Sequence, residues 1–221
     1  MNKQKFIDLD FESLSEEKML ENSRNFYKKM DKRRSVRDFS DKKVPLEMIE
    51  NIVMTASSAP SGAHKQPWSF CAVSNPELKN KIRMAAEEEE YKSYNGRMSE
   101  EWLKDLEPFE TDYKKPFIEI APWIIVVFKK PYDLVNNEKK KNYYISESVG
   151  IAVGFLLSAI HNAGLVALTH TPSPMNFLEK VLNRPENEKA FLLIPVGYPA
   201  ENVSVPALKR KSKEQVLSIY N

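Results

Sequence analysis

The sequence contains few glycines. Six occur in 221 residues, which is about 3% of the chain where about 7% is typical. They stand at Gly62, Gly96, Gly150, Gly154, Gly164 and Gly197. No three of them have the G-x-G-x-x-G spacing of a dinucleotide fingerprint, and none has the G-x-x-x-x-G-K spacing of a P-loop. A phosphate bound by this chain must therefore be held without either glycine-rich loop.

Cysteine and histidine are also scarce. The single cysteine, Cys71, can form no internal disulfide, which is typical of a reducing compartment. Its apolar neighbours in Trp68–Val73 predict a buried thiol that packs as a small hydrophobe, because a reactive thiolate needs an electropositive, partly exposed site. The three histidines, His64, His161 and His170, include no closely spaced pair, so we expect no metal site.

Strong net charge and long hydrophobic runs are missing too. Thirty-three basic and thirty-one acidic residues leave a net charge of +2, so no overall field attracts nucleic acid or an anionic membrane. Residues 1–10 lack the apolar core of a signal peptide. The longest apolar stretch, Val149–Ile160, is too short and too interrupted by glycine to be expected to span a bilayer. We therefore expect a soluble, cytoplasmic protein with neither nucleic acid nor a membrane as its partner.

Helix and strand patterns alternate along the chain, without an internal repeat or a low-complexity linker. Helical spacing and capping residues predict helices at 45–56, from 76 to at least 91, from 146 to 164, and from Ser173 onward. Apolar runs predict strands at 68–73, 123–128, 165–168 and 191–197, with 123–128 central and buried on both faces. Segments 108–116 and 136–142 are expected to be irregular, the second as a solvated loop. These patterns predict one α+β domain over residues 1–221, with both polar termini as arms.

The most regular helix is expected to begin near Ser146, a good N-cap, and to end at Gly164 in the left-handed conformation. Gly150 and Gly154 lie one turn apart beside its apolar stripe. Two missing side chains in line allow another helix to approach closely. We predict a helix contact on this face, either between subunits or as a crowded crossing within one chain.

The densest cationic cluster is R-R-S-V-R at residues 33–37. Each guanidinium can present two N–H donors to phosphate oxygens, so the cluster is a candidate phosphate clamp. An extended backbone would place Ser35 and Arg37 on one side and Arg34 on the other. The alternative is a solvated basic surface, and the second basic cluster at Leu208–Lys211 favours the clamp.

Two turn-rich segments present hydroxyl groups. Ser61 lies in Ala59–Trp68, A-P-S-G-A-H-K-Q-P-W, where proline and glycine predict a tight turn that exposes backbone N–H groups. The alternative for this segment is an ordinary connection from helix to strand. In T-H-T-P-S-P at 169–174, hydroxyls stand at the carboxyl end of an expected strand.

The order of these motifs resembles the nitroreductase superfamily and, within it, the iodotyrosine deiodinases. The resemblance rests on R-R-S-V-R, A-P-S-G-A-H-x-x-P-W, E-E-E-E-x-x-x-Y-x-x-R-M, T-x-T-P, I-P-V-G-Y-P and V-P-x-L-K-R-K. These elements run in order from Arg33 to Lys211, over nearly the whole chain. The first two alone are typical of FMN-dependent nitroreductase relatives, and the acidic helix with Lys115 is similar to the substrate lid of the deiodinases.

The resemblance implies an FMN-binding, intertwined homodimer with an α+β nitroreductase-like fold, in which helices surround a central mixed sheet. By motif position, the residues implied to bind FMN are Arg33, Arg34, Ser35, Val36, Arg37, Pro60, Ser61, Thr169, His170, Thr171 and Arg210. His170 departs from the T-T-T segment of the family. Thr171, just before Pro172, is therefore the implied catalytic hydroxyl that faces flavin N5, and no role is assigned to the imidazole.

The resemblance also implies a substrate lid over about 87–115, with Ala63, Glu90, Tyr94 and Lys115 as substrate-binding residues. The backbone N–H of Ala63 would meet the substrate phenolate. Glu90 and Tyr94, four residues apart, share a helix face. A carboxylate can receive the substrate ammonium, while a phenol and a lysine can bind its carboxylate. A run such as 87–90 is usually a solvated face, but its four like charges repel, which favours a lid that orders over a zwitterion.

The implied activity is the reductive dehalogenation of halotyrosines, in which iodotyrosine becomes tyrosine plus iodide. Reduced FMN supplies two electrons and the enzyme supplies a proton. An external reductant or reductase must feed the flavin, because the sequence encodes neither a nicotinamide fingerprint nor a ferredoxin-type cluster. The alternative is a broad-specificity FMN nitroreductase or flavin reductase that uses NAD(P)H. A flavin-binding module without catalysis is a third hypothesis.

Overall fold

The computed structural model describes residues 6–221 and divides the chain into two compact units, with the boundary in the sequence between Arg33 and Arg34. Residues 1–5, part of the segment in which we expect no signal peptide, lie outside the described residues. In the first unit, α1 spans Glu16–Asp31, and the Ser15 side chain caps it by accepting from the Lys18 backbone N–H at 3.3 Å. The sequence patterns did not predict this helix.

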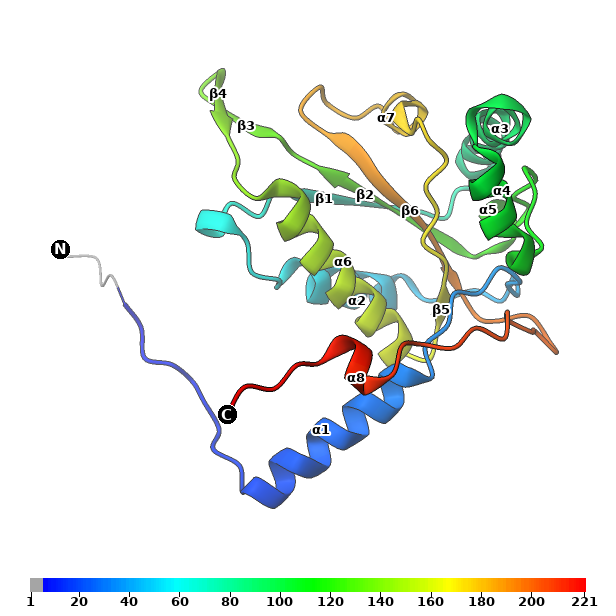
Figure 1. Cartoon of the computed structure of the whole chain (residues 1–221). Helices are drawn as coiled ribbons and strands as arrows, with labels where there is room; N and C mark the ends of the chain where they lie inside the picture. The colour runs from blue at the N-terminus through cyan, green and yellow to red at the C-terminus, as the bar shows by residue number, and fades with distance from the viewer. Residues whose placement is uncertain (1–5) are drawn as a thin grey trace. The chain divides into compact units, whose positions relative to one another are not determined.

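The second unit, Arg34–Asn221, is built on a four-stranded sheet (Figure 1). Its strands lie in the order β1 (Trp68–Val73), β2 (Trp123–Lys129), β6 (Lys189–Gly197) and β5 (Val166–Ala167). All three pairings are antiparallel, and an isolated bridge between Ser35 and Ala167 adds a parallel contact at the β5 edge. The four predicted strands are confirmed, and the one predicted over 165–168 is shorter than expected.

Helices cover both faces of this sheet. On one face lie α2 (Leu46–Ser57) and α6 (Ile145–Asn162), and on the other lie α3 (Pro76–Lys92), α5 (Phe117–Ile120) and α7 (Asn176–Val181). Strand β2 serves both cores because alternate side chains point to opposite faces. Ile125 and Val127 pack with α2 and α6, and their neighbours in the strand pack with α3 and α5. This confirms that 123–128 forms a central strand buried on both faces.

Helix α6 begins one residue earlier than expected, and its cap differs from the prediction. Tyr144 is the N-cap in a left-handed conformation with φ 46°, and it makes no side-chain capping hydrogen bond. Ser146 lies inside the helix, so its predicted capping role is wrong. The predicted left-handed end is confirmed, because Gly164 has φ 81°. A tertiary contact is made at this end of the helix: the backbone N–H of Gly62 donates to the Ser148 side chain at 3.3 Å, which ties the first turn of α6 to another segment.

By length and composition, α6 is the one helix among the described residues that could cross a membrane. Its 18 residues exceed the Val149–Ile160 stretch on which the sequence expectation rests. Such a helix is weak evidence for a membrane span, because core helices pass the same test. Here Val149, Val153, Leu156 and Ile160 are buried in the core beside α2 and the sheet, which accounts for the apolar composition.

Segment 136–142 is a β-hairpin and not the expected irregular loop. Strand β3 (Tyr132–Val135) pairs antiparallel with β4 (Glu138–Lys141). Asn136 and Asn137 make the turn with φ of 52° and 65°, a left-handed pair that asparagine tolerates and that suits a two-residue hairpin. The expected exposure is confirmed for β4, whose residues are all exposed, but Asn142 is buried.

Short elements complete the second unit. They are η1 (Gly62–His64), η2 (Ser93–Arg97), α4 (Glu100–Leu106), η3 (Glu107–Phe109) and α8 (Lys213–Val216). Segment 108–116 is largely irregular, as expected. Helix α7 starts at Asn176 with Met175 as its N-cap, so the predicted start at Ser173 and Pro174 is wrong.

Candidate functional site

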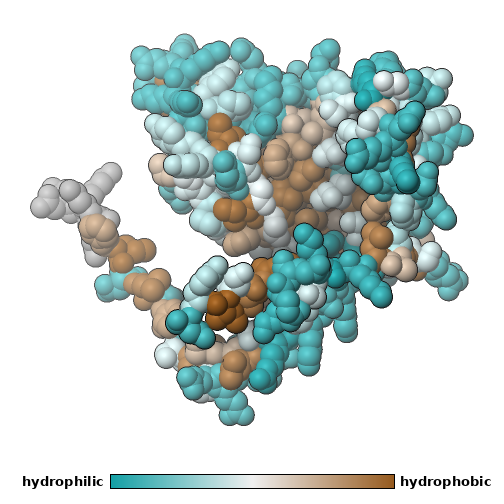
Figure 2. All heavy atoms as spheres, in the orientation of Figure 1, coloured by the Kyte–Doolittle hydropathy of each residue, from teal (hydrophilic) through white to brown (hydrophobic). Residues whose placement is uncertain are grey.

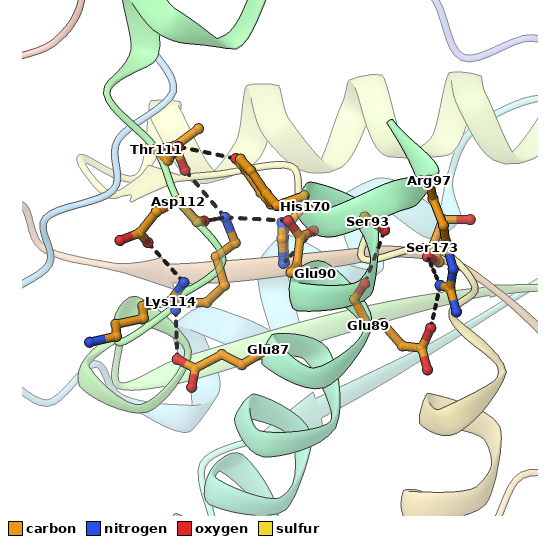
Figure 3. A network of polar contacts seen from close by, with 12 residues as sticks. Glu87, Glu89, Glu90, Ser93, Arg97, Thr111, Asp112, Lys114, His170 and Ser173 are labelled. Carbon is orange, nitrogen blue, oxygen red and sulfur yellow. Dashed lines mark hydrogen bonds and ion pairs between the residues drawn. The ribbon is translucent and has the colours of Figure 1, made fainter. Parts of the chain in front are cut away.

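Three residues that are far apart in sequence converge beside the end of α3. Glu90 lies in the last turn of α3, Tyr94 in η2, and Lys115 just before α5. Lys115 Nζ lies 3.5 Å from Glu90 Oε2 and 5.5 Å from the centre of the Tyr94 ring. It also donates to Thr111 Oγ1 at 3.2 Å and to the carbonyl of Asp112, and Tyr94 Oη donates to the Thr111 carbonyl at 3.1 Å (Figure 3). The predicted substrate triad is thus a single polar cluster.

This cluster is shielded from solvent. The side chains of Lys115 and Glu90 are 4% and 10% exposed. Burial raises the pKa of Glu90, and the Lys115 ammonium opposes that rise. Burial likewise lowers the pKa of Lys115, and Glu90 opposes that fall. Because a buried charge is stable only when it is paired, each of the two groups depends on the other in the absence of a ligand.

The acidic run at 87–90 is charge-compensated. Its ion pairs are Glu87 with Arg83 at 2.7 Å, Glu88 with Lys92 at 2.7 Å, Glu89 with Arg97 at 2.6 Å, and Glu90 with Lys115. The expectation that repulsion within the run favours ordering over a zwitterion is therefore wrong, because cations of this chain already neutralise it. Only Glu90 of the four joins the buried cluster.

Glu87 has a positioning contact that the sequence did not reveal. Its Oε1 accepts from the backbone N–H of Lys115 at 2.6 Å and from Arg83 Nε at 2.7 Å. The contact joins α3 to the loop before α5, across 28 residues of sequence. Nothing in a run of four glutamates indicates which of them will bind a backbone amide, so this contact had no detectable sequence signal.

The cationic segment that begins at residue 34 is extended, as predicted. The Val36 side chain is buried, and its backbone N–H donates to the Ala167 carbonyl at 3.2 Å. The Arg34 guanidinium donates to the Pro206 carbonyl. Ser35 and Arg37 line a pocket of about 360 Å³ together with Phe109 and Ser204–Pro206.

The charged side chains of this pocket are one cation, Arg37, and two carboxylates, Asp38 and Glu110. Arg37 lies 5.4 Å from the centre of the Phe109 ring, and burial lowers its pKa. The Asp38 charge opposes that fall. The predicted clamp has two further residues, Arg33 and Arg210. Arg33 ends the first unit, where its backbone N–H donates to the Met30 carbonyl at 3.0 Å, and Arg210 lies exposed in the carboxyl-terminal segment.

The turn after α2 is tight, as predicted from its proline and glycine. The Ser61 hydroxyl accepts from the Gln66 backbone N–H at 2.9 Å. Ala63 and His64 are left-handed, with φ of 49° and 53°. A Cβ on Gly62 would stand 2.9 Å from Tyr144 Cδ2, so glycine is required for this close approach. Pro60 and Ala63 are exposed beside the turn.

The segment from Thr169 to Thr171 presents its side chains to opposite sides. Both threonines are exposed, whereas His170 is buried and bridges to Leu193 of β6 through its backbone. Its ring meets Phe117 edge to face, with centroids 5.6 Å apart. Burial, with the nearby Lys115 and Arg37 charges, lowers the pKa of His170 to about 3. The imidazole thus points toward the Glu90 cluster, and the hydroxyls do not.

Two further expectations concern the thiol of Cys71 and metal-ligating side chains. Cys71 is half-buried, where full burial was expected, and burial raises its pKa, which disfavours a thiolate. Within residues 6–221 no group of three or more histidine, cysteine or acidic side chains is placed to hold a metal ion.

Comparisons with known proteins agree with this geometry. The model of the nitroreductase family matches residues 30–198. An iodotyrosine deiodinase from Haliscomenobacter hydrossis is 66% identical over 205 residues, which is 92% of each chain. The chain belongs to the nitroreductase family, in its iodotyrosine deiodinase branch.

More distant members of this branch are also similar. An iodotyrosine deiodinase from Nematostella vectensis is 48% identical over 92% of this chain and 78% of its own length. Among solved structures, oxidized iodotyrosine deiodinase bound to FMN and 3-iodo-L-tyrosine has a TM-score of 0.75 and 33% identity, and the match covers 89% of this chain and 98% of that one. The expected nitroreductase-like fold is confirmed.

Proposed function

We propose that this protein catalyses the FMN-dependent reductive dehalogenation of halotyrosines, converting iodotyrosine to tyrosine and iodide. The observation that carries the proposal is the buried convergence of Glu90, Tyr94 and Lys115, which offers one anion, one hydroxyl and one cation within a single cluster. An α-amino acid end group requires the same set of partners. The structural relative with FMN and 3-iodo-L-tyrosine supports the same substrate class.

The cluster would hold the amino acid end of the substrate. Glu90 accepts from the substrate ammonium, while Lys115 and Tyr94 donate to its carboxylate. Because the Lys115 and Glu90 side chains are almost fully buried, charge-assisted hydrogen bonds in this cluster are stronger than in water. When the zwitterion binds, its ammonium would pair with Glu90 and its carboxylate with Lys115. Each of the two buried charges would therefore keep a partner as the direct Lys115–Glu90 pair separates.

The residues present fit FMN. Arg34, Ser35 and Arg37 would hold its phosphate with Arg33 and Arg210, since guanidinium and hydroxyl groups donate to phosphate oxygens. Ser35 and Arg37 line one pocket, together with the carboxylates Asp38 and Glu110. Val36, Pro60, Ser61, Thr169 and His170 would complete the flavin-binding segments of the chain. The Ser61 turn lies against Tyr144 at a distance that only glycine at position 62 permits. When bound, FMN would supply the two electrons of the reaction.

The chain's own groups would direct the chemistry. Cleavage of the carbon–iodine bond takes up two electrons and one proton and releases iodide, with a carbon–hydrogen bond in its place. The Ala63 backbone N–H would donate to the phenolate oxygen and stabilise its charge. The exposed Thr171 hydroxyl would face flavin N5 and hold or pass a proton there. The iodine withdraws electrons from the ring, so iodotyrosine forms a phenolate more readily than tyrosine does. A site that stabilises the phenolate would therefore favour the halogenated substrate over tyrosine.

The proposed assembly is an intertwined homodimer. A Cβ on Gly150 or Gly154 would meet nothing within 4 Å, so a crowded crossing within one chain is excluded for the described residues. Ile151 and Phe155 on the same helix are 44% and 40% exposed. Figure 2 shows apolar residues gathered on this face of the second unit. A second copy would cover them and bring two α6 helices together.

The lid, the two terminal arms and an external reductant complete the proposed function. Residues 87–115 would act as the substrate lid, and the two termini as arms of a single domain over 1–221. An external reductant or reductase would reduce the flavin in the cytoplasm, with neither nucleic acid nor a membrane involved.

The replacement Glu90→Gln tests this function. We expect anaerobic, dithionite-reduced wild-type protein to release iodide and tyrosine from 3-iodotyrosine. In E90Q, iodotyrosine kcat/KM should fall about 10- to 100-fold, because an amide replaces the anion that receives the ammonium. The loss should be much smaller for a nitroarene, which carries no ammonium. The matched control is Glu88→Gln, whose side chain is 69% exposed and lies outside the cluster.

Two results would contradict the proposal. Purified protein without FMN would exclude flavin chemistry. Nitroarene reduction with NAD(P)H in a wild-type protein that releases no iodide would favour the alternative, a broad-specificity nitroreductase or flavin reductase.

A further inference from the structure

His170 is a buried side chain with an unused hydrogen-bonding atom. The side chain is 10% exposed, and its Nε2 has no hydrogen-bond partner. The same atom lies 3.9 Å from Glu90 Oε1, in the polar cluster of Figure 3. An unpaired buried nitrogen costs free energy, so a nearby acceptor that can approach it has a direct energetic reason to do so.

The second oxygen of Glu90 faces this nitrogen. Lys115 Nζ lies 3.5 Å from Oε2, and His170 Nε2 lies 3.9 Å from Oε1. A hydrogen bond from a ring N–H requires about 2.7–3.2 Å, so a shift of about 1 Å completes it. The carboxylate is thus placed between a cation on one oxygen and an imidazole on the other.

We propose that His170 is a positioning residue which, as the neutral Nε2–H tautomer, donates to Glu90 Oε1 and fixes the carboxylate for the substrate ammonium. This inference rests on the proposed function of the cluster. It assigns a role to the histidine that stands where the family resemblance implies threonine, and the role belongs to the amino acid end of the site.

A neutral imidazole suits this position for an electrostatic reason. Burial and the neighbouring Lys115 and Arg37 charges hold the pKa of His170 at about 3, so the ring is uncharged at neutral pH. A neutral N–H donor orients the carboxylate without adding a positive charge that would repel the incoming ammonium. When Lys115 turns to the substrate carboxylate, His170 remains as a protein donor to Glu90.

The test compares His170→Phe with His170→Gln. Phenylalanine preserves a flat ring against Phe117 but removes the donor, whereas glutamine places an N–H donor near the Nε2 position. We expect H170F to raise the KM and Kd for 3-iodotyrosine about tenfold, which corresponds to one charge-assisted hydrogen bond. The KM ratio of 3-iodotyrosine to 2-iodophenol should rise as well, since 2-iodophenol carries no ammonium. H170Q should recover most of the loss.

A pH profile separates this role from a purely structural one. The titratable or charged groups that face the pair are Lys115 and Asp112 from the loop before α5, Tyr94 from η2, and Arg37. Glu90 binds the ammonium only in its ionised form, and a hydrogen bond donated to the carboxylate lowers the pKa of Glu90. Without that bond its pKa rises, so the loss of iodotyrosine affinity on acidification should begin at higher pH in H170F than in wild type or H170Q.

Nitrogen NMR of the wild-type holoprotein measures the protonation of the ring directly, and H170Q serves only to assign its signal. We expect one imidazole, assigned by its absence in H170Q, to stay neutral down to pH 5 with its proton on Nε2. The inference is overturned if this ring titrates near pH 6.5. It is also overturned if wild type dehalogenates iodotyrosine while H170F, with full FMN content, keeps the wild-type KM and pH profile. Wild-type protein that neither binds nor dehalogenates iodotyrosine instead overturns the proposed function, and this inference with it.

Discussion

At the scale of single residues, Lys115 is constrained more than a binding lysine requires. Its ammonium contacts Glu90, Thr111 and the carbonyl of Asp112, and its backbone N–H contacts Glu87. Its side chain is 4% exposed. In the proposed function the same ammonium would bind substrate, so activity and stability would be coupled at this position.

Replacing Lys115 with Met should destabilise the protein by about 3 kcal/mol at pH 7, because Glu90 would keep a buried charge without its partner. The measurement is urea unfolding of wild type and K115M. The double variant K115M/E90Q is the control and should recover much of the loss. Equal stability of the single and double variants would contradict this explanation.

The same variant should show a characteristic pH dependence. Burial already raises the pKa of Glu90 in the folded state, and Lys115 opposes that rise. Without Lys115 the folded-state pKa is raised further above the unfolded value of about 4.3. A raised carboxyl pKa means that the folded state binds the proton more tightly, so stability falls as pH rises from the unfolded pKa through the folded pKa. The deficit of K115M should therefore be largest near pH 7 and should shrink toward pH 4.

At the scale of elements, the end of α3 organises the predicted lid. Glu89 pairs with Arg97 of η2, which also donates to the Ser173 carbonyl at 3.4 Å. Glu87 binds the backbone of Lys115. Neighbouring glutamates of one run therefore hold two different segments, since successive helical residues point in directions about 100° apart.

Glu87 and Glu88 allow a matched comparison. Glu87→Ala should lower the free energy of unfolding by about 1–2 kcal/mol, because it removes the acceptor of the Lys115 N–H. Glu88→Ala removes only an exposed ion pair with Lys92 and should cost less than about 0.5 kcal/mol. Denaturant unfolding measures both, and limited proteolysis between residues 110 and 116 should be faster only in E87A. Identical behaviour of the two variants would show that Glu87 does not position the loop.

At the scale of the whole molecule, apolar surface remains uncovered in one chain. Ile151 and Phe155 stand exposed on α6 beside two glycines. Exposed apolar side chains also occur near both ends, among them Phe6, Phe11, Leu217 and Tyr220. Exposed apolar side chains on one helix, such as Ile151 and Phe155, are typical of subunit contacts.

Phe155→Lys should shift the protein toward a monomer, because it places a charge in the proposed contact of α6 with a second copy. We expect the dimer dissociation constant to rise at least about tenfold, as for a central interface residue. Light scattering coupled to size exclusion gives the mass. The control is Met84→Lys on α3, which is 61% exposed and lies on the opposite face of the sheet. A wild-type monomer, or an F155K dimer as tight as wild type, would refute this contact.

Much of the fold was predictable because its signals are local. Trp68–Val73 and the strand from Trp123 were assigned from continuous apolar runs, and the helix from residue 76 from its proline start. The cap of α6 was not predictable from Ser146, since the N-cap is Tyr144 in a left-handed conformation. Helix α1 was missed because its apolar residues are few and none of them is buried.

The sequence by itself determined the strands, the arginine segment and the residue types that can bind an amino acid zwitterion, because those features depend on short-range spacing and on side-chain chemistry. Only the tertiary structure decided that Lys115 reaches Glu90, that Glu87 binds the Lys115 backbone, and that His170 faces the same carboxylate. Those contacts join residues 25 to 80 positions apart, and no local pattern specifies them. They form because packing on the sheet brings α3, the loop before α5 and the segment after β5 into one buried volume, where unpaired charges are too costly to remain.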